Sequence, residues 1–178
     1  MKSRRKKQMS NQDYNDRWYV RGHWEHEGLI RAVGFGGFLI VLGIIFAITP
    51  DLFQKISAFF SEMTTQRLPF AGGLGNLVLP APQNPAAHMD FFRAVMQFDI
   101  GIAALEFTLL LMRLSLQRVH RVAETVGNLV FWGGSAILTN MFLLAGTLKG
   151  WFEYWAALVV LVGVSLIIRA IVHFVRRR

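Results

Sequence analysis

Long apolar runs separated by short polar segments make up most of the chain after residue 28. Each of the four runs holds about 20 residues, the number that a helix needs to cross a hydrocarbon core about 30 Å thick. Helix is the expected form because unpaired backbone groups cannot lie in lipid, and the short alternating segments of a membrane barrel are missing. The pattern therefore predicts an all-α integral membrane protein, a bundle of four transmembrane helices over residues 29–49, 91–112, 126–148 and 151–172.

The one long connection, between the first two runs, divides into two parts. Residues 51–63 place their apolar side chains on one helical face, which predicts an amphipathic helix lying in the outer membrane interface. Its three phenylalanines leave open the alternative that it docks onto a partner subunit. Residues 64–90 hold four prolines and three glycines, so we expect an irregular outer loop there. The glycine-rich run 72–75 could suggest a phosphate-binding loop. We set this interpretation aside because the run lacks the Lys-Ser/Thr ending of such a loop.

Composition agrees with this pattern and narrows the chemistry. The length of 178 residues suggests one domain. Charged residues make up 17% of the chain, against about 25% in soluble proteins. There is no cysteine, which excludes disulfides, iron–sulfur clusters and thiolate metal sites.

Lys and Arg concentrate at the two ends, in the arm 1–28 with its aromatic juxtamembrane part and in the tail 173–178. The net charge of +8 would also suit nucleic acid. Beside membrane spans, however, basic segments set topology and attract anionic lipid. We therefore expect the lipid bilayer as a partner and no nucleic acid. The residues expected at lipid head groups are Arg4, Arg5, Lys6, Lys7, Arg176, Arg177 and Arg178.

The distribution of basic residues also predicts the orientation of the spans. If the N-terminus is inside, 15 of the 19 Lys and Arg residues lie on the cytoplasmic side, either in the segments outside the spans or at the helix ends next to those segments. The connection 113–125 is one of these cytoplasmic segments. The bias places both termini in the cytoplasm and favours the plasma membrane. The first run is an anchor rather than a cleaved signal peptide, because it begins late and is too long. The basic residues left on the outer side are Lys55, Arg67, Arg93 and Lys149.

Two acids in the second span carry the strongest functional signal. Asp99 and Glu106 are seven residues apart and share one helical face. A carboxylate near mid-helix costs about 2.5–3.5 kcal/mol on insertion scales. One interpretation is structural, with hydrogen bonds from the third span. The alternative is a proton or cation path. The two acids are about 10 Å apart along the helix axis, however, so they cannot share one proton directly. The polar residues considered with them are Arg93, Asn128, Ser135, Thr139 and Asn140.

The sequence offers little for catalysis or cofactors. His23 and His26 are three residues apart and form a weak metal-binding candidate, since no third ligand accompanies them. Haem at the inner edge would need His120 or His173 together with another chain, and nothing in the sequence supports it. We identify no catalytic residue and predict no cofactor. These observations favour a non-enzymatic role.

Small residues at regular spacing point to assembly. In the first span they recur every four positions, and in the fourth every seven. Such positions let two helix backbones approach closely, and there are more of them than one bundle needs. We expect a non-catalytic subunit or scaffold that assembles with other membrane subunits or with copies of itself; the alternative is a small oligomeric transporter or channel using Asp99 and Glu106. The helix-packing candidates are Gly28, Ala32, Gly36, Gly101 and Gly163.

Overall fold

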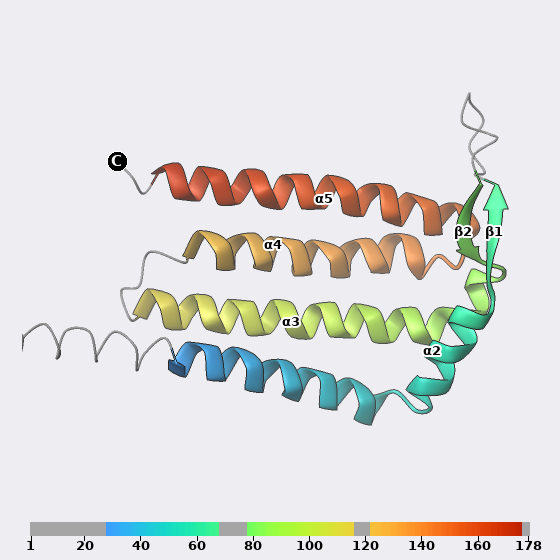
Figure 1. Ribbon diagram of the computed structural model, residues 1–178, viewed down its shortest axis with the longest axis horizontal. Coiled ribbons are helices and arrows are strands. Elements are labelled where there is room, and N and C mark those ends of the chain that lie inside the picture. Colours follow the sequence, from blue (N-terminus) through green and yellow to red (C-terminus); the bar gives the residue numbers. More distant parts are fainter. Residues whose placement is uncertain (1–27, 68–77, 116–121, 176–178) are drawn as a thin grey trace, which may run out of the picture.

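A computed structural model of the chain describes residues 28–67, 78–115 and 122–175 (Figure 1). Four helices in this part are long and apolar enough to cross a membrane, as the apolar runs predict. They are the N-terminal helix Gly28–Ile48, then α3 Met89–Ser115, α4 Val122–Leu138 and α5 Leu148–Val175. A short 3₁₀ helix, η1, precedes α3 at Pro85–His88, and a π-helical turn, η3, extends α4 over Thr139–Leu143.

The four long helices stand side by side in chain order (Figure 1). α4 packs against α3 on one side and α5 on the other, while the N-terminal helix and α5 form the two edges. Successive helices run in opposite directions. Residues 28, 115, 122 and 175 therefore lie at one end of the row, and residues 48, 89, 143 and 148 lie at the other. We call this second end, where residues 63–67 and 78–82 pair as two strands of a hairpin, the hairpin end.

α3 and α5 are longer than the spans expected for them, residues 91–112 and 151–172. α3 has 27 residues and α5 has 28, which correspond to about 40 Å at 1.5 Å per residue. A hydrocarbon core is about 30 Å thick. The helical hydrogen bonding thus continues past the apolar stretches from which the spans were predicted, because charged and polar residues near the ends are also good helix formers.

α2, Leu52–Ser61, crosses the hairpin end (Figure 1). Asp51 precedes it with φ of 55°, a left-handed conformation that Asp adopts more readily than most residues and that turns the chain sharply out of the N-terminal helix. The apolar face of α2 divides in two, because Leu52 and Phe59 are buried whereas Phe53 and Phe60 are exposed. One half therefore packs on the helix row and the other half is left outside.

The prediction of irregular structure over residues 64–90 is wrong for three of its parts: residues 64–67 and 78–82 are strands, and residues 85–90 are helical. β1, Met63–Arg67, pairs antiparallel with β2, Val78–Pro82, and Met63 lies opposite Pro82. Proline disfavours a central strand because it lacks an N–H donor, but both strands of a two-stranded hairpin are edges and tolerate it. The glycines at 72, 73 and 75 lie outside the described residues.

The apolar core gathers at the hairpin end. Phe59 of α2 contacts the rings of Phe92 and Trp151, with centroids 5.9 and 5.8 Å away. The indole nitrogen Nε1 of Trp151 donates to the carbonyl oxygen of Pro80 at 3.1 Å. His88, buried against Phe59, lies 3.0 Å from a carboxylate oxygen of Glu62. Aromatic packing and two polar contacts thus hold α2 and the hairpin on the ends of α3 and α5.

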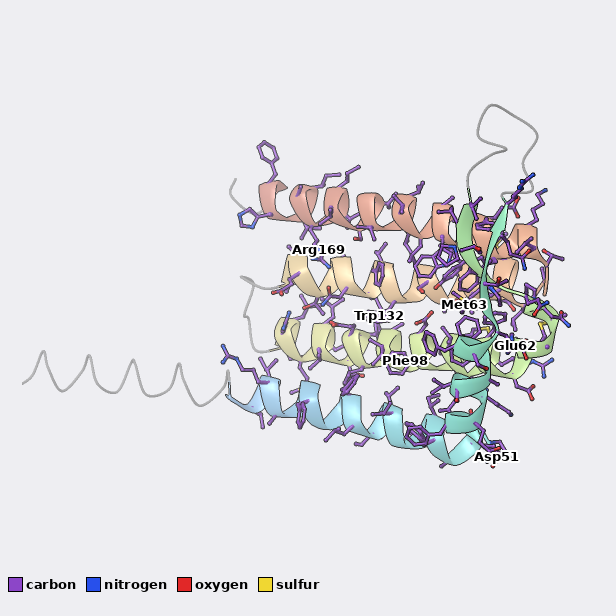
Figure 2. All side chains as sticks on the ribbon, turned by 45° about the vertical axis from the view of Figure 1, so that its right-hand side comes forward. Asp51, Glu62, Met63, Phe98, Trp132 and Arg169 are labelled. Atoms are coloured by element: carbon purple, nitrogen blue, oxygen red, sulfur yellow. The ribbon has the colours of Figure 1, made fainter. Side chains whose placement is uncertain are left out.

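Away from that end, aromatic and small residues join the helices. Phe98 of α3 makes edge-to-face contacts with Phe38 of the N-terminal helix and with Trp132 of α4 (Figure 2). A Cβ atom built on Gly101 would lie 2.6 Å from Cγ1 of Val41, which real Cβ atoms do not tolerate. Glycine at this position is therefore what lets the N-terminal helix approach α3 closely.

Candidate functional site

The first candidate site surrounds Asp99, in the half of α3 nearer the hairpin. The hydroxyl of Ser135 donates to Oδ2 of Asp99 at 2.7 Å, and the hydroxyl of Thr139 lies 3.5 Å from the same oxygen. The hydroxyl oxygen of Tyr154 lies 3.5 Å from that of Ser135. We call these four residues the hydroxyl cluster. All four are buried, and they come from α3, α4, η3 and α5, so the cluster joins three neighbouring helices.

The hydroxyl cluster contains one acid and no base. Among the described residues, the hydrogen-bond partners of the Asp99 carboxyl group are hydroxyl groups, and none of the ion pairs includes it. A buried carboxylate charge without a counter-charge is expensive. The oxygens of the cluster are also the type of ligand that hard cations prefer.

The second candidate site surrounds Glu106, about 10 Å along α3 from Asp99 at 1.5 Å per residue. Nδ2 of Asn128 donates to Oε1 of Glu106 at 2.9 Å. Nη2 of Arg169 donates to Oδ1 of the same amide at 2.6 Å. Asn128 suits this position because its side chain both donates and accepts. We call these three residues the amide cluster; like the hydroxyl cluster, it joins α3, α4 and α5.

The amide cluster is balanced in charge, unlike the hydroxyl cluster. Arg169 and Arg113 both attract the carboxylate of Glu106, and Glu124 repels it. Arg113 also donates a hydrogen bond to the hydroxyl of Thr125, a fully buried residue of α4. Glu106 therefore has an amide donor and cationic neighbours from its own chain, and the sequence alone did not distinguish it from Asp99.

A glycine provides the space for Arg169. A Cβ atom built on Gly127 would overlap the Cγ, Cδ and Nε atoms of Arg169, so the arginine stem lies directly against the α4 backbone. Nε of Arg169 is buried there without a hydrogen-bond partner in the described structure. Figure 2 shows Arg169 toward the end of the row away from the hairpin.

Sequence reasoning missed Arg169 as a member of the site and counted it only in the positive-inside bias. The available signal was its position three residues inside the expected span 151–172, between Ile168 and Ala170. Charges in a span usually face the protein interior and pair there. The adjacent Gly127 and Asn128 of the third span were the second signal. Tyr154 was not among the polar residues considered with Asp99.

Two other polar candidates lie apart from both clusters. Arg93 is exposed at the hairpin end and pairs with Asp90, with nitrogen and oxygen 3.6 Å apart. Asn140 is exposed on η3. The weak metal candidates and the residues expected at head groups lie outside the described residues; these are His23, His26, Arg4, Arg5, Lys6, Lys7, Arg176, Arg177 and Arg178.

The helix-packing candidates divide into two groups. Gly101 lies in the interface between α3 and the N-terminal helix. At Gly28, Gly36 and Gly163, by contrast, an added Cβ atom would have no neighbour within 4 Å in the described structure. Ala32 is exposed. Within the part of the chain that the structure describes, these four positions therefore leave room for a neighbouring helix.

The described chain is thus a helical protein with four helices able to span a membrane, two polar clusters between α3, α4 and α5, and open small-residue positions. Comparisons of the sequence with protein-family models and with curated proteins, and of the fold with solved structures, gave no match.

Proposed function

We propose that the protein is a non-catalytic integral membrane subunit or scaffold, which assembles with other membrane helices in a larger complex. The observation that carries this proposal is the open small-residue face of the N-terminal helix, at Gly28, Ala32 and Gly36. Small residues on a span allow a second backbone to approach within packing distance, which drives association in lipid.

The geometry of the N-terminal helix supports the proposal. Gly37 and Gly34 face α3, where added Cβ atoms would meet Leu105 and Leu109. At 100° per residue, Gly28, Ala32 and Gly36 lie on the side of the helix away from α3. This helix is an edge of the row (Figure 1), so its second glycine face has room for a helix from outside. Gly163 of α5 offers a similar open position on the other edge.

The orientation belongs to the same proposal. Residues 28 and 175 lie at the same end of the helix row as residues 115 and 122. The excess of Lys and Arg in the segments next to these residues supports placing that end in the cytoplasm and the hairpin end outside. The plasma membrane is the membrane that we propose.

Replacing Gly36 by Leu tests the assembly. A Cβ atom built at this position would have no neighbour within 4 Å in the described structure, and leucine is a better helix former than glycine, so the single chain should remain folded. Its leucine should nevertheless block the approach of a second helix. We expect wild-type protein from native membranes to migrate with other subunits or copies in mild detergent, and Gly36→Leu to migrate as a smaller species.

The matched control is Gly133→Leu, the same substitution at an open position of α4 that lies outside the small-residue face of the N-terminal helix, and it should leave the assembly intact. A wild-type protein that purifies as a lone monomer would contradict the proposal. So would a Gly36→Leu protein that assembles as the wild type does.

A second candidate function is proton- or cation-linked transport, and the hydroxyl cluster favours it. Asp99 is buried with hydroxyl partners and without a basic partner among the described residues, so a proton or a hard cation could neutralise it. Glu106 already has cationic neighbours. Flux into liposomes should then be lost in Asp99→Asn and only reduced in Glu106→Gln; flux unchanged in the double variant would rule this candidate out.

A further inference from the structure

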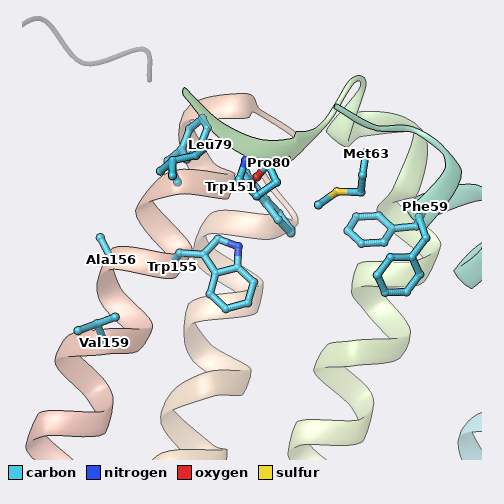
Figure 3. Close-up of a pocket in the computed structure, with 10 residues that line it drawn as sticks. Phe59, Met63, Leu79, Pro80, Trp151, Trp155, Ala156 and Val159 are labelled. Atoms are coloured by element: carbon cyan, nitrogen blue, oxygen red, sulfur yellow. Dashed lines mark hydrogen bonds between the residues drawn. The ribbon is translucent and has the colours of Figure 1, made fainter. Parts of the chain in front are cut away.

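A groove at the hairpin end is separate from the two polar clusters, because none of their residues lines it. It has a volume of about 680 Å³, opens on one side, and is lined by apolar residues of α2, the hairpin and α5. Figure 3 shows Trp155 and Val159 of α5 on one side, Met63 and Phe59 on the other, and Pro80 above. We propose that this groove holds one acyl chain of a membrane phospholipid.

The position of the groove argues for an occupant from the bilayer. Its α5 wall continues onto the surface of a helix able to span a membrane, and Trp155 and Val159 are 48% and 71% exposed. A chain in the groove would therefore pass directly into the hydrocarbon around α5. The groove lacks charged lining residues among those described, so it suits the tail of a lipid rather than its head group.

Charged groups suited to a head group lie close in sequence to the groove. Lys149 and Glu153 lie on the first two turns of α5, and their side chains form an ion pair of 3.4 Å. Trp151 and Phe152 of the same turns line the groove. The hydrogen bond from Trp151 to Pro80 joins the hairpin to these turns. A phospholipid would thus meet apolar lining along its tail and charged side chains beside its head group.

The size of the groove is that of a small-ligand site. A single flexible chain fits the space, which lies within the range of about 300–1,000 Å³ for small-ligand sites.

Filling the groove tests the proposal. Val159→Trp places a ring in the groove at a position that is 71% exposed, so the fold should tolerate it. The control is Val160→Trp on the next residue of α5, which is 66% exposed and does not line the groove. The full chain would be purified in mild detergent with a limiting amount of a synthetic phosphatidylethanolamine–phosphatidylglycerol mixture and weighed by native mass spectrometry.

We expect one phospholipid adduct per wild-type chain, kept in Val160→Trp. Occupancy in Val159→Trp should fall at least about tenfold. The same titration with phospholipid brominated on its acyl chains should quench tryptophan fluorescence, saturating at one lipid per chain in the wild type and in Val160→Trp. A wild-type chain without an adduct would overturn the proposal, as would equal occupancy in the two variants or an adduct with the mass of a polypeptide.

Discussion

At the scale of the residue, the amide cluster depends on Gly127, because glycine has no side chain to fill the space beside the α4 backbone. Gly127 leaves room for Arg169 to reach Asn128. Gly127→Ala should therefore displace the arginine and lower the free energy of unfolding by about 1–3 kcal/mol, as overpacking does. Gly133→Ala, where nothing lies within 4 Å, should instead raise it by about 0.5–1 kcal/mol. Denaturant titration in detergent micelles measures both.

The same two residues, Gly127 and Arg169, allow a test in which the loss of stability caused by Gly127→Ala is reversed. In an Arg169→Ala background the side chain that a new Cβ atom would meet is shortened, so Gly127→Ala should no longer destabilise. A penalty of equal size in both backgrounds would show that Gly127 serves a purpose other than accommodating Arg169.

The hydroxyl cluster makes a separate prediction. A double-mutant cycle of Asp99→Ala with Ser135→Ala should give a coupling energy of about 0.6–1.7 kcal/mol, the range measured for hydrogen bonds between spans. Ser165 is the matched control, because it is buried but its hydroxyl donates to the carbonyl of Val162 within its own helix. Its coupling to Asp99 should be close to zero. Equal coupling for both serines would contradict the assigned contact.

At the scale of the element, neighbouring phenylalanines separate the two faces of α2. Phe59 is 5% exposed within the hairpin-end core, whereas Phe60 is 65% exposed. Phe59→Ala should cost about 3–5 kcal/mol through the cavity that it leaves. Phe60→Ala should cost much less, since it removes little buried surface. Thermal unfolding in micelles measures the difference, and similar losses for both variants would place α2 differently on the helix row.

The elements differ in how far the sequence predicts them. The four spans were predictable because about 20 consecutive apolar residues have few alternatives to a membrane helix. The hairpin was not, because Pro80 and Pro82 indicate irregular structure unless the strand is known to be an edge. Its five-residue register is accompanied by a contact with α5, in which Trp151 and Pro80 are 71 residues apart in sequence.

The candidate site was predictable in the same partial way. Asp99 and Glu106 were conspicuous because acids are rare in spans, and the polar residues of the third span were the evident places for partners. The sequence did not predict that Glu106 has basic neighbours whereas Asp99 has hydroxyl partners. This difference arises from Arg169, whose distance in sequence from Glu106 hides the fact that both contact Asn128.

At the scale of the whole molecule, the account requires lipid around the four long helices and water at their two ends. The absence of cysteine allows single cysteines to report on this directly. Arg67 of β1 and Ser115 at the end of α3 are both exposed and lie at opposite ends of the helix row. A membrane-impermeant thiol reagent applied to intact cells and to permeabilised cells therefore distinguishes the two sides.

We expect Arg67→Cys to react in intact cells, and Ser115→Cys and His173→Cys to react only after permeabilisation. Cysteines at Arg67 and Ser115 that react from the same side, or a chain that remains folded and soluble without detergent or lipid, would contradict the membrane-spanning arrangement.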